Sequence, residues 1–127
     1  MKKHVLLTGA TGHLGREALK LLCEQLKYRI TVLYRDSSAN RKKMAPYKHK
    51  VEMIQLDLSQ ANDMHKLEGS FDVLIHLAAV IPPLAIEQPE LTYRVNYLGT
   101  KNLLSRLEKI SPHCFFMFSS SIVVYGD

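Results

Sequence analysis

Near its start the chain reads Thr8-Gly9-Ala10-Thr11-Gly12-His13-Leu14-Gly15, with three glycines at three-residue spacing. A short apolar run, residues 3–8, leads directly into this stretch and is typical of a β-strand. After it, apolar residues recur at helical spacing, namely Leu14, Ala18, Leu21, Leu22 and Leu26. The glycine stretch therefore predicts a tight turn between a first strand and an amphipathic helix, residues 13–26.

The rest of the chain continues the alternation of strands and helices. Further strands are predicted at residues 30–34, 51–56, 71–77 and 114–118, and a long helix at about residues 87–108. Parallel neighbours need helical crossovers, so this order predicts an α/β fold with a doubly wound parallel sheet of about five strands. We expect the two strands nearest the C-terminus to be buried on both faces. No linker or repeat divides residues 1–127, which we interpret as one domain.

The glycine turn has a mechanical and a chemical interpretation. Gly9 permits the sharp bend, Gly12 lets the backbone approach a pyrophosphate, and Gly15 lets the helix pack closely on the strand. The unpaired N–H groups at the helix N-terminus would then stabilise the phosphates. Glycine turns also serve simple strand-to-helix packing, but a position between the first strand and first helix favours a dinucleotide site.

Four more motifs follow the glycine turn in order. They are Asp57-Leu58, His76-Leu77-Ala78-Ala79, Asn96 with Gly99-Thr100, and Phe118-Ser119-Ser120-Ser121 running to Val124-Tyr125-Gly126-Asp127. With the turn, whose spacing is T-G-x-x-G-x-x-G, they resemble the extended branch of the short-chain dehydrogenase/reductase superfamily, the NAD-dependent epimerase/dehydratase family. The resemblance covers the whole chain and implies a Rossmann-type sheet with strand order 3-2-1-4-5 and helices on both faces.

The resemblance implies a role for each motif. Together with the glycine turn and the end of the second strand, it gives the residues that we expect to bind a cofactor: Gly9, Thr11, Gly12, His13, Leu14, Gly15, Arg35, Asp57, Leu58, Leu77, Ala78, Ala79 and Ser119. Asp57 and Leu58 would hold the adenine edge, and residues 77–79 would line the cofactor groove. Ser121 matches the catalytic serine, whose hydroxyl hydrogen-bonds the reacting oxygen of the substrate, and Asn96 matches a helix residue that supports the site.

These residues also have plain structural interpretations. Asp57 fits a turn carboxylate, and the alanines at 78 and 79 fit ordinary packing. Ser121 fits a helix cap or loop residue, and Asn96 fits a solvated or helix-bending asparagine. The surrounding motifs favour the functional interpretation of Ser121, whereas Asn96 stays balanced between the two.

The general acid/base of the family is a Tyr-x-x-x-Lys pair roughly two dozen residues beyond the serine. The one match in this chain, Tyr97 with Lys101, precedes Ser121 and overlaps the Asn96 motif, so we interpret it as a surface or packing pair on a helix. We therefore expect the chain to be the N-terminal, cofactor-binding part of a longer enzyme, inactive by itself. We also expect strand 114–118 at an exposed sheet edge, where it favours self-association into a homo-oligomer.

The end of the second strand predicts which cofactor is bound. A carboxylate there accepts the ribose 2′-hydroxyl of NAD, whereas a cation pairs with the 2′-phosphate of NADP. Arg35 occupies the discriminating position, Asp36 follows it, and the basic run 41–43 comes soon after. This order resembles dihydroflavonol-reductase-like members of the family and favours NADP(H) over NAD(H), although a shift of one residue would bring Asp36 into play.

Composition excludes several other classes of protein. The 127 residues are 46% apolar and 23% charged, which is typical of a folded domain, and no apolar run approaches the ~18 residues of a membrane span. Without a signal-peptide core, the N-terminus predicts a cytoplasmic protein. The six histidines show no metal-site spacing, and a net charge of +5 without a recognition motif does not indicate nucleic acid. The partners we expect are a dinucleotide and a small substrate, with a sugar nucleotide as a candidate; a non-catalytic redox sensor is the alternative.

Overall fold

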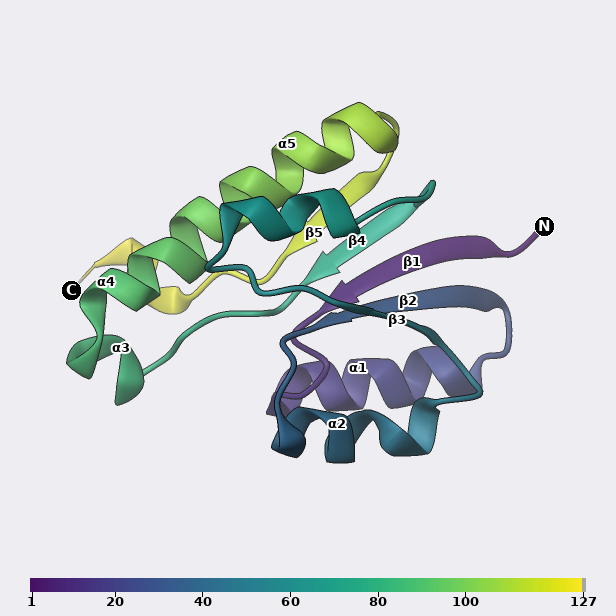
Figure 1. Ribbon diagram of the computed structural model, residues 1–127, viewed down its shortest axis with the longest axis horizontal. Helices are drawn as coiled ribbons and strands as arrows, with labels where there is room; N and C mark the ends of the chain where they lie inside the picture. Colours follow the sequence, from purple (N-terminus) through teal and green to yellow (C-terminus); the bar gives the residue numbers. More distant parts are fainter. Residues whose placement is uncertain (127) are drawn as a thin grey trace.

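The protein, described by a computed structural model over residues 1–126, contains a parallel five-stranded sheet of order β3-β2-β1-β4-β5 (Figure 1). The strands are β1 (Lys3–Thr8), β2 (Tyr28–Tyr34), β3 (Glu52–Gln55), β4 (Val73–His76) and β5 (Phe115–Phe118). All four neighbouring pairs run parallel, with Val5 opposite both Ile30 and Val73. The predicted parallel sheet and its strand order are confirmed.

Helices cover both faces of this sheet. Figure 1 shows α1 and α2 below it, and α4 and α5 above it. The helices are α1 (His13–Glu24), α2 (Ser38–Met44), α3 (Leu84–Glu87), α4 (Pro89–Thr92) and α5 (Thr100–Ile110), with a π-helix, η3 (Tyr93–Gly99), between the last two. Short 3₁₀ helices are η1 (Ala45–Tyr47), η2 (Ala61–Lys66) and η4 (Ile122–Tyr125). The predicted long helix is therefore one helical stretch with a π-helical middle, and none of the helices described in residues 1–126 is long and apolar enough to cross a membrane.

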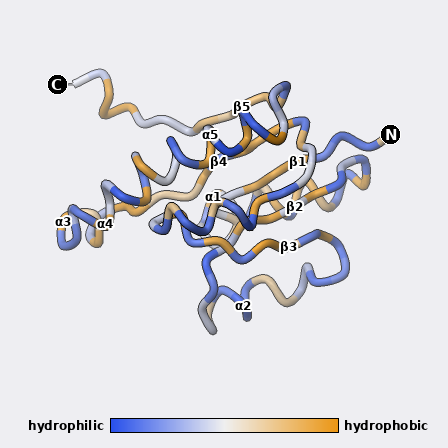
Figure 2. Tube along the Cα trace, turned by 45° about the horizontal axis from the view of Figure 1, so that its top comes forward, coloured by the Kyte–Doolittle hydropathy of each residue, from blue (hydrophilic) through white to orange (hydrophobic). Residues whose placement is uncertain are grey.

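Two hydrophobic clusters form the core, one on each face of the sheet. Successive strand residues alternate between them: Leu6 packs toward η2 and α5, whereas Leu7 packs toward α1 and α2. Both leucines are fully buried. Figure 2 shows the strands as mainly hydrophobic segments and α2 with its following loop as mainly hydrophilic. The sheet is thus held from both sides, and its strand ends are fixed for the loops that follow them.

The buried face of α1 agrees only in part with the predicted apolar residues, of which Ala18 and Leu22 are half-buried. Leu14 and Leu21 are 61% and 56% exposed, whereas Leu19 is fully buried and Gly15 lies against the sheet. Gly15, Leu19 and the half-buried Cys23 follow one another at i and i+4, so this row faces β1 and β2. The reason is the close approach at Gly15, which turns that side of the helix toward the sheet.

The expectation that β5 is buried on both faces is wrong. Its residues Phe115 and Phe118 are 65% and 57% exposed, whereas β4 buries Leu74 and His76 almost completely. In residues 1–126, β5 has only β4 as a neighbouring strand, so its outer edge and much of both faces meet solvent. The predicted position of this strand at an exposed sheet edge is confirmed.

Candidate cofactor-binding site

The glycine turn brings the start of α1 against the ends of β1 and β4. Gly9 has φ +79°, and a Cβ there would lie 2.5 Å from the carbonyl carbon of Leu77. A Cβ on Gly15 would lie 1.8 Å from the carbonyl oxygen of Gly9. Both distances are far shorter than van der Waals contact, so the backbones can approach this closely only because side chains are absent. The predicted sharp bend at Gly9 and close helix packing at Gly15 are confirmed.

The N-terminus of α1 lacks an internal cap. Gly12 is the N-cap residue and has no side chain to cap the helix, and no acidic residue lies in the first turn. Within residues 1–126, no side chain bonds to the N–H groups of that turn. By contrast, the N-cap of α2 is Ser37, whose Oγ accepts from the Asn40 N–H at 3.1 Å. Thr11 is half-buried, and His13 and Leu14 are exposed beside the uncapped turn. Free N–H groups and the positive end of the helix dipole make this turn suitable for a phosphate.

The segment that leaves β4 forms the second side of the site. The N–H groups of Leu77 and Ala78 both donate to the Thr8 hydroxyl at 3.1 Å, beside Gly9. Ala79 is exposed, and the next residue, Val80, bonds through both its N–H and its carbonyl to the Asn96 side chain at 2.8 and 2.9 Å. The predicted groove residues therefore lie in a segment that is fixed at both ends.

Asn96 lies in the π-helix η3, where it binds main chain rather than facing solvent. Its side-chain amide donates to the Val80 carbonyl and its side-chain oxygen accepts from the Val80 N–H. These two bonds connect the helix to the loop after β4. That Asn96 supports a catalytic site stays a prediction. A direct part in proton transfer stays a prediction.

His76 lies at the end of β4 and was not assigned a role from the sequence. It is 1% exposed and opposite Thr8 in the sheet register, with 2.6 Å between its Nδ1 and the Thr8 Oγ1. Burial lowers the pKa of His76 to about 4. A histidine at the end of an otherwise apolar strand was the sequence feature that could have indicated a role for His76. Its hydrogen-bond partners could not be predicted, because they lie far away along the chain.

The loop after β3 forms the third side of the candidate cofactor site. The Oδ1 of Asp57 accepts from the N–H and the hydroxyl of Ser59 at 2.9 and 2.7 Å, which is the turn arrangement left open above. The backbone of Leu58 meets η3, where a Cβ on Gly99 would lie 2.8 Å from the Leu58 carbonyl oxygen. Contact with an adenine stays a prediction for both residues.

Basic side chains cluster where β2 ends. The Oδ1 of Asp36, one of the two candidate specificity residues, pairs with Arg41 at 2.5 Å, and both side chains are exposed. The Arg35 side chain is exposed and has no ion-pair partner in residues 1–126. Lys43 reaches from α2 to the glycine turn, where its Nζ donates to the Thr11 carbonyl at 3.2 Å. Positive charge therefore lies beside the uncapped end of α1.

Ser119 and Ser121 follow β5 and are both exposed. Ser121 is the N-cap of η4, and its Oγ accepts from the Val123 N–H at 3.3 Å. This is the cap arrangement that the sequence left open, and it leaves the hydroxyl hydrogen available to another acceptor. The Asp127 end of the motif lies outside the described residues.

Tyr97 and Lys101 are both exposed, as expected of a surface pair. The ring of Tyr97 is 54% exposed and stacks on the ring of Tyr93, with 5.2 Å between the centroids. Tyr97 therefore packs along its own helix.

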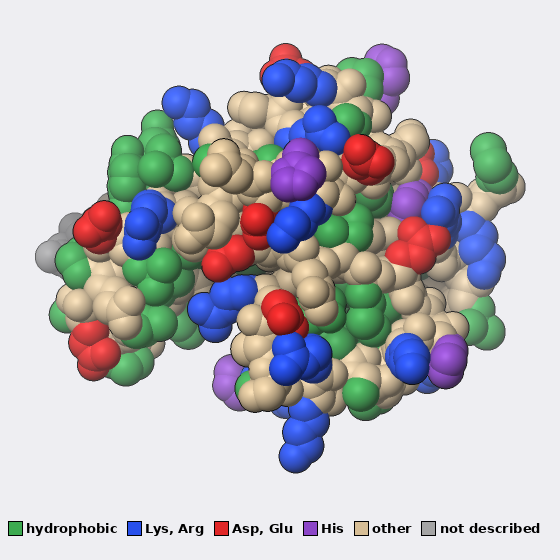
Figure 3. All heavy atoms as spheres, in the orientation of Figure 1, with side chains coloured by type: hydrophobic (Ala, Val, Ile, Leu, Met, Phe, Trp, Pro, Cys, Tyr) green, Lys and Arg blue, Asp and Glu red, His purple; other side chains and the backbone are tan. Residues whose placement is uncertain are grey.

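The predicted cofactor-binding residues follow the carboxyl ends of the five parallel strands, which meet at one end of the sheet. Figure 3 shows a hollow at the left of the molecule, between the layer of α1 and α2 and the layer of α4 and α5, with Lys or Arg side chains beside it. In a doubly wound sheet this edge is where ligands bind, at the point where the strand order reverses. Across residues 1–126, no group of three or more His, Cys, Asp or Glu side chains is placed to hold a metal ion.

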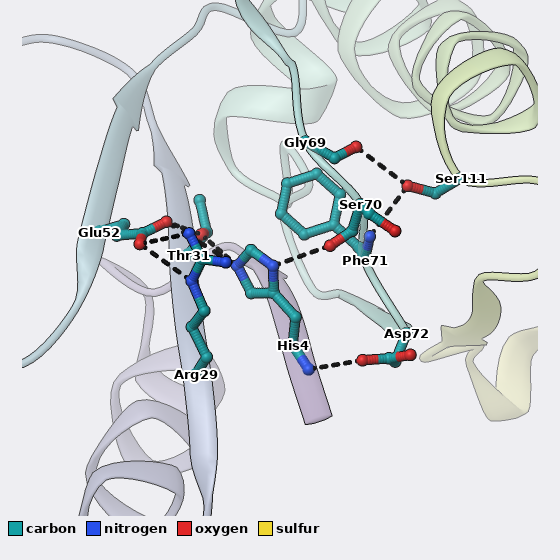
Figure 4. Close-up of polar contacts among 9 residues, drawn as sticks. All are labelled: His4, Arg29, Thr31, Glu52, Gly69, Ser70, Phe71, Asp72 and Ser111. Atoms are coloured by element: carbon teal, nitrogen blue, oxygen red, sulfur yellow. Dashed lines mark hydrogen bonds and ion pairs between the residues drawn. The ribbon is translucent and has the colours of Figure 1, made fainter. Parts of the chain in front are cut away.

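A second polar cluster lies at the amino ends of the strands, away from the candidate cofactor site (Figure 4). His4 is buried there, with 2.7 Å between its Nε2 and Thr31 Oγ1, and Glu52 bonds both Thr31 and Arg29. The hydrogen bond from Arg29 holds the pKa of Glu52 below its usual value. The cluster borders an open hollow of about 720 Å³ at the amino ends of the strands. Its side chains bind one another, so it fastens β1, β2 and β3 together.

Comparison with known proteins agrees with this geometry. The sequence pattern of the NAD dependent epimerase/dehydratase family matches residues 5–127. D-erythronate dehydrogenase of Haemophilus influenzae is 32% identical over 96% of this chain and 39% of that protein. The putative UDP-arabinose 4-epimerase 2 of Arabidopsis thaliana is 33% identical over 98% of this chain and 31% of that protein. The chain thus spans roughly a third of the length of these curated relatives.

Solved structures share the fold. The Bordetella bronchiseptica enzyme WbmH in complex with NAD⁺ superposes with a TM-score of 0.81 at 18% identity, over 99% of this chain and 41% of that one. The Thermus thermophilus UDP-glucose 4-epimerase complex with NAD gives a TM-score of 0.67 at 23% identity, over 84% and 34% of the two chains. At these identities the likeness concerns the fold alone.

Proposed function

Because the chain belongs to the NAD-dependent epimerase/dehydratase family, we propose that it binds a nicotinamide dinucleotide across the carboxyl edge of its sheet. The observation that carries this proposal is the uncapped N-terminus of α1 at Gly12, beside the end of β4 and a cluster of basic side chains. The pyrophosphate would lie on the free N–H groups of α1. The adenine would lie toward Asp57 and Leu58, and the nicotinamide toward residues 77–79.

The whole protein is proposed to transfer a hydride between the nicotinamide and a hydroxyl or carbonyl carbon of a small substrate. Ser121 would donate its free hydroxyl hydrogen to the reacting oxygen, and Asn96 would keep the neighbouring loop in place. Two relatives are named for a sugar acid and a sugar nucleotide, which makes a polyhydroxy substrate the first class to test. Residues 1–127 alone are proposed to bind the cofactor without turnover, since their one Tyr-x-x-x-Lys match lies on the surface.

We further propose that NADP(H) is preferred over NAD(H). Asp36, which could accept a ribose hydroxyl, is paired with Arg41, whereas the Arg35 guanidinium has no ion-pair partner within residues 1–126. An unpaired guanidinium can bind a 2′-phosphate through two parallel hydrogen bonds. The ion pair at Asp36 thus supports Arg35 as the residue that selects the cofactor.

Titration calorimetry of the 127-residue chain with NADPH and NADH tests both proposals. We expect the unmodified chain to bind NADPH more tightly, and Arg35→Asp to weaken NADPH binding roughly tenfold or more while NADH binding changes little, because hydrogen bonds to a charged group contribute about 1.5–3 kcal/mol. Lys109→Asp, the same charge change in the last turn of α5, is the matched control. Absence of binding to either nucleotide would contradict the proposed function, and equal losses for both would exclude Arg35 as the selecting residue.

Self-association through β5 is a separate proposal. The strand offers an unpaired edge and four exposed apolar side chains within the described chain. We expect Met117→Lys to shift the chain toward the monomer in sedimentation velocity, because a lysine on an edge strand opposes pairing with a second copy. Leu21→Lys on α1, where the leucine is similarly exposed, should leave the distribution unchanged. A monodisperse monomer of the unmodified chain at high concentration would contradict this proposal.

A further inference from the structure

A run of hydrogen bonds at the end of β4 determines which ring nitrogen of His76 carries the proton. The Thr100 hydroxyl donates its single hydrogen to the Asn96 carbonyl at 2.8 Å, because a carbonyl can only accept. The Nε2 of His76 lies 2.8 Å from the same hydroxyl oxygen. Since that oxygen has no second hydrogen to give, Nε2 must be the donor.

The other side of the ring leads independently to the same protonation state. The Thr8 hydroxyl oxygen accepts from the N–H groups of Leu77 and Ala78, both at 3.1 Å, and the Leu77 N–H is shared with the Thr8 carbonyl at 3.3 Å. Within residues 1–126, the remaining partner of this hydroxyl is the His76 ring, which can accept its hydrogen. The hydroxyl hydrogen must therefore point to the His76 Nδ1, 2.6 Å away. Nδ1 accepts, so the ring is neutral and carries its hydrogen on Nε2.

We propose that His76, in this neutral Nε2–H form, and Thr100 together are positioning residues of the dinucleotide site. Neither is assigned a role by the motif resemblance. The two side chains connect the β1 and β4 ends to the turn of η3 that carries Asn96. The proposal rests on the proposed dinucleotide site, whose groove they would shape.

The geometry indicates how the pair acts on the groove. Residues 77–80 are bound at their start by Thr8 and at their end by the Asn96 side chain. His76 lies between these two attachment points. The Thr100 hydroxyl donates to the carbonyl of Asn96, and the side chain of Asn96 holds Val80. The donors all point in one direction along this chain, an arrangement in which each bond polarises the next. Loss of the Thr100 hydroxyl would therefore leave a buried Nε2–H without a partner and loosen the Val80 end of the segment.

The protonation state is measurable in the unmodified chain by long-range ¹H–¹⁵N NMR of the histidine rings at pH 7. His76→Gln assigns the signals. We expect His76 in the neutral Nε2–H form. The Nδ1–H form, or a doubly protonated ring at this pH, would overturn the proposal whether or not any nucleotide binds.

Thr100 variants test the positioning role. Thr100→Val removes the hydroxyl at nearly constant volume, and we expect NADPH affinity to fall roughly tenfold, the upper range for one neutral hydrogen bond, with mixed ring forms at His76 and faster exchange of the Val80 amide. Thr100→Ser should restore all three. Thr92→Val is the matched control, because Thr92 also donates to the carbonyl four residues earlier, at 2.8 Å from the Gln88 oxygen, but bonds no histidine within residues 1–126.

The outcomes separate this inference from the proposed function. Wild-type affinity in Thr100→Val, or an equal loss in Thr100→Ser, would overturn the positioning role. If the unmodified chain binds neither NADPH nor NADH, the proposed function fails, while the ring form of His76 and the exchange of Val80 in the same variants still decide whether the pair fixes this segment.

Discussion

Gly15→Ala is expected to destabilise the chain by about 3 kcal/mol or more, the upper range for overpacking, and thereby to abolish nucleotide binding. The new Cβ would lie 1.8 Å from the Gly9 carbonyl oxygen and 2.4 Å from its carbon. These atoms belong to the backbone of the turn, so no side chain can rotate away and α1 must separate from β1. Urea unfolding followed by circular dichroism measures the loss.

Gly12→Ala is the matched control on the same turn. A Cβ at Gly12 would meet only the Gly9 oxygen at 3.5 Å, an ordinary contact, and the residue has φ −86°. We expect its free energy of unfolding to stay within about 1 kcal/mol of the unmodified chain. If the two variants were equally stable, the close packing of α1 on the turn would not be the reason for glycine at position 15.

The second large effect is a loss of stability in acid caused by His76. Its pKa falls from the ordinary 6.5 to about 4 in the folded chain, because burial disfavours the charged ring. Between these values the unfolded chain binds more protons, so stability is complete above about pH 7, decreases as the pH falls, and levels off below about pH 4. At 1.36 kcal/mol per pKa unit the loss is about 3 kcal/mol.

His76→Gln isolates this contribution. We expect its free energy of unfolding in urea to vary less with pH between 7 and 4.5 than that of the unmodified chain, whatever its value at pH 7. His113→Gln, at an exposed position, should leave the variation unchanged. Glu52 and Asp63, whose pKa values are lowered from 4.5 and 3.8, lose most of their contributions below this range, and they do so in both proteins alike. Identical pH profiles for His76→Gln and the unmodified chain would contradict the prediction.

Local patterns in the sequence predicted the topology well. A glycine turn after a β-branched run, followed by alternating strand and helix patterns, leaves a parallel sheet as the consistent arrangement, and the structure has that order. The apolar spacing in α1 predicted its buried face only in part: Leu22 packs on the core, but Leu14 and Leu21 are exposed. The close contact at Gly15 turns the row with Leu19 toward the sheet. Burial of β5 was also misjudged, since an edge strand and a central strand can have the same apolar composition.

The sequence by itself determined the fold class, the position of the glycine turn and the family, because these depend on short-range spacing and on the order of motifs along the chain. Only the tertiary structure decided how the polar residues are paired. Asn96 with Val80, and His76 with both Thr8 and Thr100, are contacts between separate elements. The sheet register and the helix crossovers set these distances. Hydrogen bonding inside the core then fixes the protonation of His76, which cannot be predicted from the spacing of residues along the chain.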